Sequence, residues 1–119
     1  MLEITDFEER GARIVEPVGR LDTLTAKTFE THLKGHVENG DGPLLVNMMS
    51  VDYVSSFGLR SILIVAKQLA PSGRKFVLYA PNPSVLDVLR ISGFLKIVAV
   101  ADTKDAALAE AGGAAGAAD

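Results

Sequence analysis

The stretch from Leu44 to Ala66, LLVNMMSVDYVSSFGLRSILIVA, constrains the fold more than any other part of the chain. An apolar run breaks into a polar turn with two adjacent serines, and a second apolar run follows a glycine. We interpret it as a buried strand over Leu44–Met49, a turn, and a helix whose first turn is residues 55–58. A serine at a helix start meets unpaired backbone N–H groups and the positive end of the helix dipole. Such a serine can cap the helix or, once modified, hold a phosphate.

Strand and helix patterns alternate along most of the remaining chain. The first two predicted strands have no helix between them, so we expect a mixed sheet. The pattern predicts one α/β domain over residues 1–111, with a sheet of about four or five strands packed with about four helices. The other predicted strands are 2–8, 12–18, 75–80 and 95–101, and the predicted helices run from Thr23 or Thr25 to about Glu38, over Leu59–Ala70, from Asn82-Pro83 and around Asp105–Glu110.

Composition excludes several classes of protein. The net charge of −3 gives no support for nucleic-acid binding, and the absence of cysteine rules out disulfides and thiolate metal sites. No apolar run approaches the roughly 20 residues that cross a membrane. Residues 1–14 are charged and lack the apolar core of a secretory signal, so we expect a cytoplasmic protein. Residues 112–119 (GGAAGAAD) are low-complexity, and we expect a flexible tail.

The residues alone allow three interpretations of the adjacent serines. Capping of the helix is the favoured one, because serine is a preferred N-cap and the cap explains one of the two. The second is an exposed hydroxyl on a turn, with Gly58 letting another protein approach. The third is a nucleophilic serine, but no glycine stands two residues before Ser55 or Ser56, as a G-x-S-x-G elbow requires. No nucleotide-phosphate loop motif is present either.

Ordinary structural roles explain the other polar residues. His32 and His36 share a helix face, but no third ligand is evident in the sequence, so partly exposed helix residues are favoured over a metal site. We expect no metal and no cofactor. Asp22 and Asp52 are turn-type aspartates that could together form an acidic rim around the serines. The basic residues Arg60, Arg74 and Lys75 are scattered, and we expect solvated surface positions.

Three motifs in combination resemble the STAS domain. Gly19-Arg20-Leu21-Asp22 resembles its G-x-L-D element, and Asp52 to Arg60 (DYVSSFGLR) resembles its central D-x-x-x-S-x-G-L signature. Lys75–Ala80, Pro83–Leu89 and Ser92-Gly93-Phe94 are similar to its closing strand, helix and turn. The resemblance covers about residues 2 to 110. The sequence departs from the common D-S-[ST]-G pattern at two positions, since Ser55 replaces the acidic residue and Phe57 replaces a small one.

The resemblance implies an anti-sigma factor antagonist and no enzyme. Such a protein binds an anti-sigma factor that is also a serine kinase, and so frees a sigma factor. The kinase phosphorylates a serine of the central motif, and a phosphatase reverses the modification. Matching the Gly-Leu pair places the modified serine at Ser56, with Ser55 as the alternative acceptor, and Asp22 at the acidic position beside it. The implied partner-binding residues are Asp22, Ser55, Ser56, Phe57, Gly58, Leu59 and Arg60.

Two other classes remain open at this point. One is a scaffold STAS module, in a sensory assembly or as an accessory subunit of a membrane lipid transporter, in which the serines are interface caps. The other is a small hydrolase that uses one of the serines, for which a histidine partner is missing. The sequence does not fix the sigma pathway, the partner or the oligomeric state.

Overall fold

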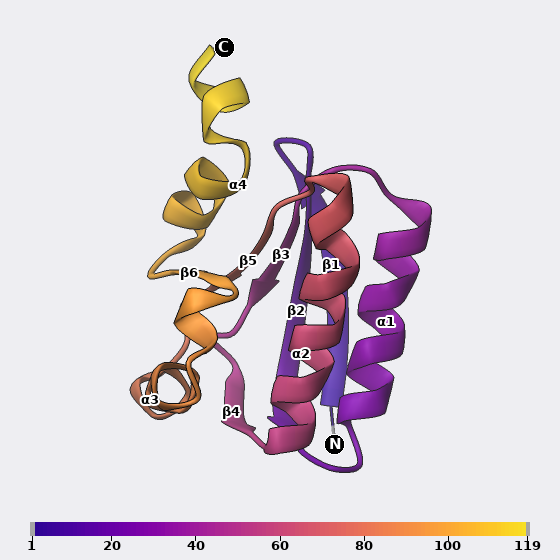
Figure 1. The fold of residues 1–119 in the computed structure, drawn as a ribbon, viewed down its shortest axis with the longest axis vertical. Helices are drawn as coiled ribbons and strands as arrows, with labels where there is room; N and C mark the ends of the chain where they lie inside the picture. Colours follow the sequence, from indigo (N-terminus) through magenta and orange to yellow (C-terminus); the bar gives the residue numbers. More distant parts are fainter. Residues whose placement is uncertain (1, 119) are drawn as a thin grey trace.

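The chain adopts an α/β fold, in which helices flank one mixed β-sheet (Figure 1). The structure, a computed structural model, describes residues 2–118, and for residues 113–118 it describes the backbone only. Strands β1 (Leu2–Glu9) and β2 (Ala12–Leu21) form an antiparallel hairpin, as the lack of a helix between them predicts. Its turn is Arg10-Gly11, with both residues at positive φ. The remaining strands pair in parallel, which confirms the mixed sheet.

The sheet runs in the order β1-β2-β3-β5-β6, and β4 lies off this path beside β2. These strands are β3 (Leu44–Asn47), β4 (Val51–Val54), β5 (Phe76–Tyr79) and β6 (Ala99–Ala101). Strand β2 is long enough to take two partners in succession. Its residues 13–15 pair with β3, and its residues 19–21 pair with β4.

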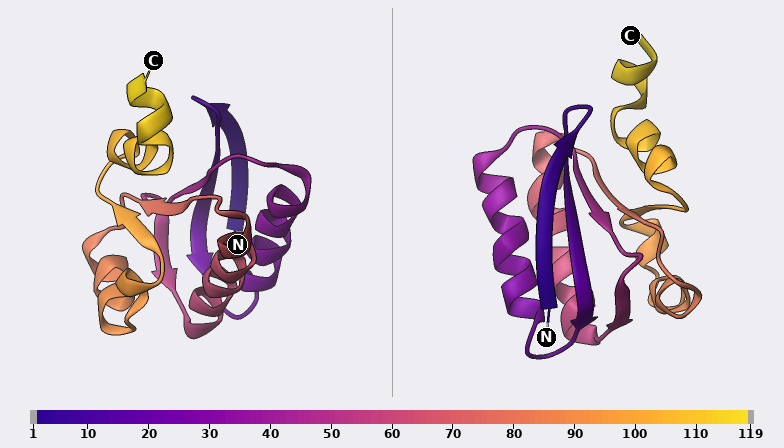
Figure 2. Two further views of the ribbon diagram at one scale, coloured as in Figure 1. Left: turned by 45° about the horizontal axis from the view of Figure 1, so that its top comes forward. Right: turned by 180° about the vertical axis from the view of Figure 1, so that it is seen from behind.

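Helices cover the two faces of the sheet unequally. Helices α1 (Ala26–Asn39), α2 (Ser56–Leu69) and α3 (Pro83–Ile91) bury their apolar sides in the larger core, with Phe29, Ile62 and Leu89 fully buried. The other face carries a smaller core under α4 (Lys104–Ala118), centred on Ile14, Leu45 and Ala107. Seen from behind, no helix covers the β1–β2 hairpin (Figure 2). The uncovered face of the hairpin leaves Val18 exposed.

Pro17 lies inside β2, although a proline lacks the N–H that a strand interior uses. It pairs with Ile4 of β1 in the antiparallel register. The N–H groups of Arg13 and Gly19 donate to the β3–β4 side, to the carbonyl oxygens of Pro43 and Ser50. Because strand residues alternate, the Pro17 nitrogen also faces that side, in the break between the pairing of β2 with β3 and with β4. No sheet hydrogen bond is therefore lost at the proline.

Several elements differ from the sequence-based prediction, and β2 extends past its predicted end at residue 18 to Leu21. The expected turn after residue 49 contains the short strand β4, and the strand expected over Leu95–Ala101 begins only at Ala99. A 3-10 turn over Phe94–Lys96 precedes it, because Gly93 takes the left-handed conformation and Phe94 turns into the core. Helix α4 continues to Ala118 but is non-helical at Gly112, where the expected tail begins.

The flexibility of residues 112–119 stays a prediction, because Asp119 and the side chains of residues 113–118 lie outside the described part of the chain. Among the residues that the structure describes, no helix combines the length and the apolar character that a membrane crossing needs.

Candidate functional site

The candidate site lies where two neighbouring parallel strands end together. Leu21 at the end of β2 pairs with Val54 at the end of β4, and the Ser55 N–H donates to the Leu21 carbonyl oxygen over 2.8 Å. Asp22 and Ser55 are the next residues of their chains. The fold therefore brings the Gly19–Asp22 motif beside the serine motif, although about thirty residues separate them in sequence.

The two adjacent serines occupy different positions at the start of α2. Ser55 is the N-cap, with extended backbone (φ −85°, ψ 174°), and its Oγ accepts a hydrogen bond from the Gly58 N–H over 3.3 Å. Ser56 is the first residue of the helix and is exposed. The hydroxyl of Ser55 thus stabilises the helix terminus, whereas that of Ser56 faces solvent beside the positive end of the helix dipole.

Asp22 is held in a tight turn before α1. Its Oδ1 accepts hydrogen bonds from the N–H groups of Leu24 (3.0 Å) and Thr25 (3.1 Å). The hydrogen bond from the Thr25 backbone is the main reason that the pKa of Asp22 lies below its usual value. Thr25 is the N-cap of α1 by position only, because its hydroxyl donates to the Arg20 carbonyl oxygen rather than capping the helix. The site therefore carries a fixed negative charge beside the serines.

Gly58 is buried, which corrects the expectation that it opens the surface to a partner. A Cβ at this position would lie 3.0 Å from both the Cβ and the carbonyl oxygen of Leu21, and 3.1 Å from Val54 Cγ1. The glycine thus allows the first turn of α2 to pack on the ends of β2 and β4. Leu59 also turns inward and packs, half-buried, against the larger core.

Exposed apolar side chains flank the serines. Phe57 is 50% exposed and Leu24 is 86% exposed. Phe57 lines a shallow cavity of about 290 Å³ between the first turns of α1 and α2, with Lys27 and Arg60 among the other lining residues. Sequence reasoning did not single out Leu24, and its only signal is an isolated leucine inside a polar turn. We define the serine surface as the half-buried Asp22 together with the exposed residues Leu24, Ser56, Phe57 and Arg60.

The other sequence-predicted candidates lie apart from the serine surface or have different roles. Asp52 is exposed on β4. His32 and His36 contact Asp6 of β1 and neither serine. Neither histidine is therefore placed to act as a general base for a nucleophilic serine. Arg74 is no solvated surface residue, which corrects that expectation. Its guanidinium donates to the carbonyl oxygens of Gly42 (2.7 Å), Val37 (3.0 Å) and His36 (3.3 Å), and so ties the end of α1 to the next loop.

Comparison with known proteins agrees with this geometry. The family model described as STAS domain matches residues 4–107. BtrV of Bordetella bronchiseptica, named as an anti-sigma factor antagonist, is 38% identical over 91 residues, which are 76% of this chain and 78% of the relative.

Solved structures show the same fold. An anti-sigma factor antagonist from Thermotoga maritima superposes with a TM-score of 0.86 at 25% identity, covering 91% of this chain and 93% of its own. Another from Mycobacterium paratuberculosis gives 0.87 at 21% identity, covering 93% and 94%. The phosphorylated form of the Bacillus protein SpoIIAA gives 0.68 at 15% identity, covering 92% and 98%.

Proposed function

Because this chain belongs to the STAS domain family and, within it, to the anti-sigma factor antagonists, we propose that it binds an anti-sigma factor through the serine surface. Binding frees a sigma factor for transcription in the cytoplasm. The anti-sigma factor is also a serine kinase, phosphorylates Ser56 and thereby releases the antagonist, and a phosphatase restores the binding form. The observation that carries this proposal is the exposed Ser56 hydroxyl at the first position of α2.

The choice of Ser56 over Ser55 rests on what each hydroxyl does in the fold. The Ser55 oxygen accepts the Gly58 N–H, so a phosphate on it would displace the helix cap. The Ser56 hydroxyl projects from the helix, and a phosphate there lies near the unpaired N–H groups of the first turn. Phosphorylation of Ser56 therefore leaves the fold of the domain intact.

Electrostatics at the interface supply the switch. Phosphorylation adds roughly −1.5 to −2 charges at neutral pH. The helix dipole tolerates this charge in the free protein, but a docked partner removes the water that solvates it. The carboxylate of Asp22 adds like-charge repulsion, since its lowered pKa keeps it ionised at neutral pH. A loss of about 3 kcal/mol weakens binding by roughly a hundredfold.

Apolar anchors supply the affinity of the unmodified surface. A leucine at 86% exposure and a phenylalanine at 50% exposure gain free energy when a partner covers them. Aromatic side chains beside a pocket are common anchors of protein interfaces. Phe57, which replaces the small residue of the common motif, therefore adds contact area next to Ser56 rather than removing the site.

Partner capture tests the proposal with a matched pair of variants. Leu24 and Ile91 are equally exposed, at 86% and 85%, but Ile91 lies on α3, away from the serine motif. We expect the unmodified chain, used as bait in lysate of its own organism, to retain a kinase-fold anti-sigma factor identified by mass spectrometry. Leu24→Asp loses this partner and Ile91→Asp keeps it. Equal capture by both variants, or capture of transporter or sensory-scaffold subunits only, contradicts the proposal.

A further inference from the structure

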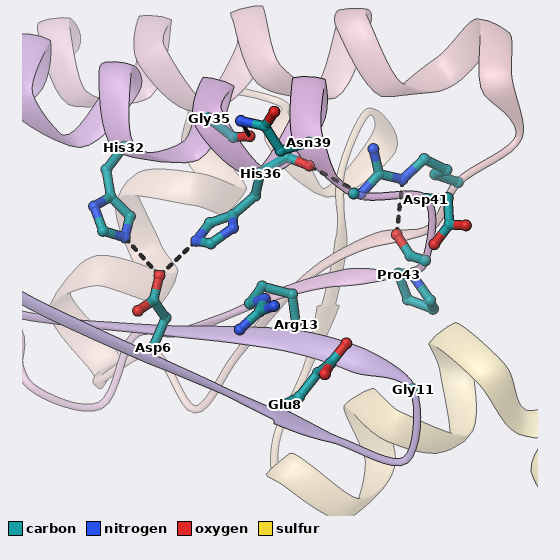
Figure 3. A pocket seen from close by; sticks show the side chains of 13 residues that line it. Asp6, Glu8, Gly11, Arg13, His32, Gly35, His36, Asn39, Asp41 and Pro43 are labelled. Carbon is teal, nitrogen blue, oxygen red and sulfur yellow. Dashed lines mark hydrogen bonds and ion pairs between the residues drawn. The ribbon is translucent and has the colours of Figure 1, made fainter.

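Both histidines of the chain converge on one carboxylate (Figure 3). His32 and His36 lie one turn apart on α1 and point toward the hairpin, with their rings 5.2 Å apart. The Nε2 atom of His32 lies 2.8 Å from Oδ2 of Asp6, and the Nε2 atom of His36 lies 2.5 Å from the same oxygen. The three side chains are partly exposed, between 23% and 32%. The cluster is thus open to solvent and already assembled by the fold.

The structure supplies the ligand that the sequence does not reveal. Asp6 lies 26 residues before His32, in β1. Leu2 and Ile4 of the same strand pack against the larger core, and strand alternation places Asp6 on that face too, beneath α1. The helix period brings His32 and His36 together above it. The helical spacing in the sequence identifies only the two histidines as possible ligands.

We propose that Asp6, His32 and His36 bind a divalent transition-metal ion, with Zn²⁺ as the preferred ion. Two imidazole nitrogens and one carboxylate oxygen form a donor set that suits Zn²⁺ and disfavours Mg²⁺ and Ca²⁺. The three ligand atoms all lie within 4.8 Å of one another. Ligands of a tetrahedral zinc ion lie about 3.3 Å apart, so each of the two nitrogen–oxygen distances, 2.8 Å and 2.5 Å, has to lengthen by less than ~1 Å to admit the ion.

Asp6 is already hydrogen-bonded to both proposed histidine ligands. Partial burial acts to raise the pKa of Asp6, but hydrogen bonds from His32 and His36 lower it below its usual value. The carboxylate is therefore charged near neutral pH. A ring nitrogen binds a metal only without its proton, so metal binding replaces both hydrogen bonds between the histidines and Asp6. The ion would then join the two imidazoles and the carboxylate in place of those hydrogen bonds.

The surroundings leave space for an exogenous ligand. The cluster lies at one end of a cavity of about 530 Å³ that Glu8, Arg13 and Asn39 also line. Zinc held by three protein ligands keeps a fourth position for water or a small anion. The bound ion joins the edge strand β1 to α1. It stabilises the folded chain by mass action, since the unfolded chain does not hold the three ligands together.

Zinc titration of the purified chain tests the site. Calorimetry at about pH 7.5 should show one Zn²⁺ ion per chain, and the melting temperature should rise with Zn²⁺. Asp6→Asn and His36→Asn should each weaken binding by about tenfold or more. Asp41→Asn is the matched control, because this exposed carboxylate lines the same cavity outside the cluster, and it should bind as the wild type does.

Imidazole nitrogen spectra give a second measurement that does not depend on affinity. The chain has only two histidines, so both ring systems are assigned by comparing His32→Asn with His36→Asn. Zinc should shift both Nε2 resonances at one equivalent, and Mg²⁺ should shift neither. Circular dichroism identifies any variant that fails to fold. Unsaturable binding, equal affinities in all variants, or unshifted Nε2 resonances would overturn the proposal.

Discussion

The two adjacent serines show how neighbouring residues of one type divide structural and functional roles. Ser55 has extended backbone and caps α2, whereas Ser56 is the first helical residue and is exposed. The phosphorylation of Ser56 that we propose therefore leaves the cap in place. The two roles are separable by removing one hydroxyl at a time.

Removal of each hydroxyl should affect stability unequally. Ser55→Ala loses the hydrogen bond to the Gly58 N–H, and we expect a cost of about 1 kcal/mol in the free energy of unfolding. Ser56→Ala, the matched control, should change it by less than about 0.5 kcal/mol. Urea unfolding followed by circular dichroism measures both. A larger cost for Ser56→Ala than for Ser55→Ala would show that the cap is assigned to the wrong serine.

Residue-level prediction succeeds where the physics is local and fails where it is long-range. Capping by one of the serines follows from residue type and position alone. The contacts of Arg74 with His36 and Val37 join residues 38 and 37 positions apart, and no local pattern encodes them. The same is true of Asp6 beneath the two histidines. Leu24 was missed because exposure of a leucine is visible only in the folded turn.

At the scale of elements, the packing of α2 on the ends of β2 and β4 depends on a missing side chain. Gly58→Ala places a Cβ 3.0 Å from the Leu21 Cβ and carbonyl oxygen, one of which is backbone. We expect it to lower the free energy of unfolding by about 1–3 kcal/mol, because the helix has to shift away from the strand. Urea unfolding measures the change.

Gly35→Ala is the control for the Gly58 variant. Gly35 also lies within a helix, α1, but a Cβ there meets nothing within 4 Å. Alanine is the better helix former, so this substitution should stabilise the chain by up to about 1 kcal/mol. Opposite signs for the two variants support the packing role of Gly58. A neutral or stabilising Gly58→Ala contradicts it.

Element prediction was most accurate for long periodic segments. The helix over residues 26–39 and most of the first hairpin follow from their apolar patterns, although β2 runs three residues past its predicted end at residue 18. Strand β4 was missed because two of its four residues, Asp52 and Tyr53, are exposed and it follows β3 closely. Its strand character comes from pairing with β2, a contact that local propensity does not contain.

At the scale of the whole molecule, sheet order builds the site. Local patterns predict an α/β domain, but they do not say that β2 takes β3 and then β4 as partners. That arrangement places Asp22 beside Ser55. The motifs marked these residues separately, through resemblance to the STAS family, and the topology brings them together. The same hairpin carries Asp6 to α1, on a different part of the surface.

We propose that a phosphate on Ser56 switches off binding to the anti-sigma factor. The direct test measures the affinity of the captured partner for the unmodified chain and for the chain phosphorylated at Ser56. The genuine phosphoprotein outranks Ser56→Asp, because aspartate carries only part of the phosphate charge. We predict binding about a hundredfold weaker for the phosphoprotein with an unchanged circular dichroism spectrum. Equal affinities of the two forms would contradict the account.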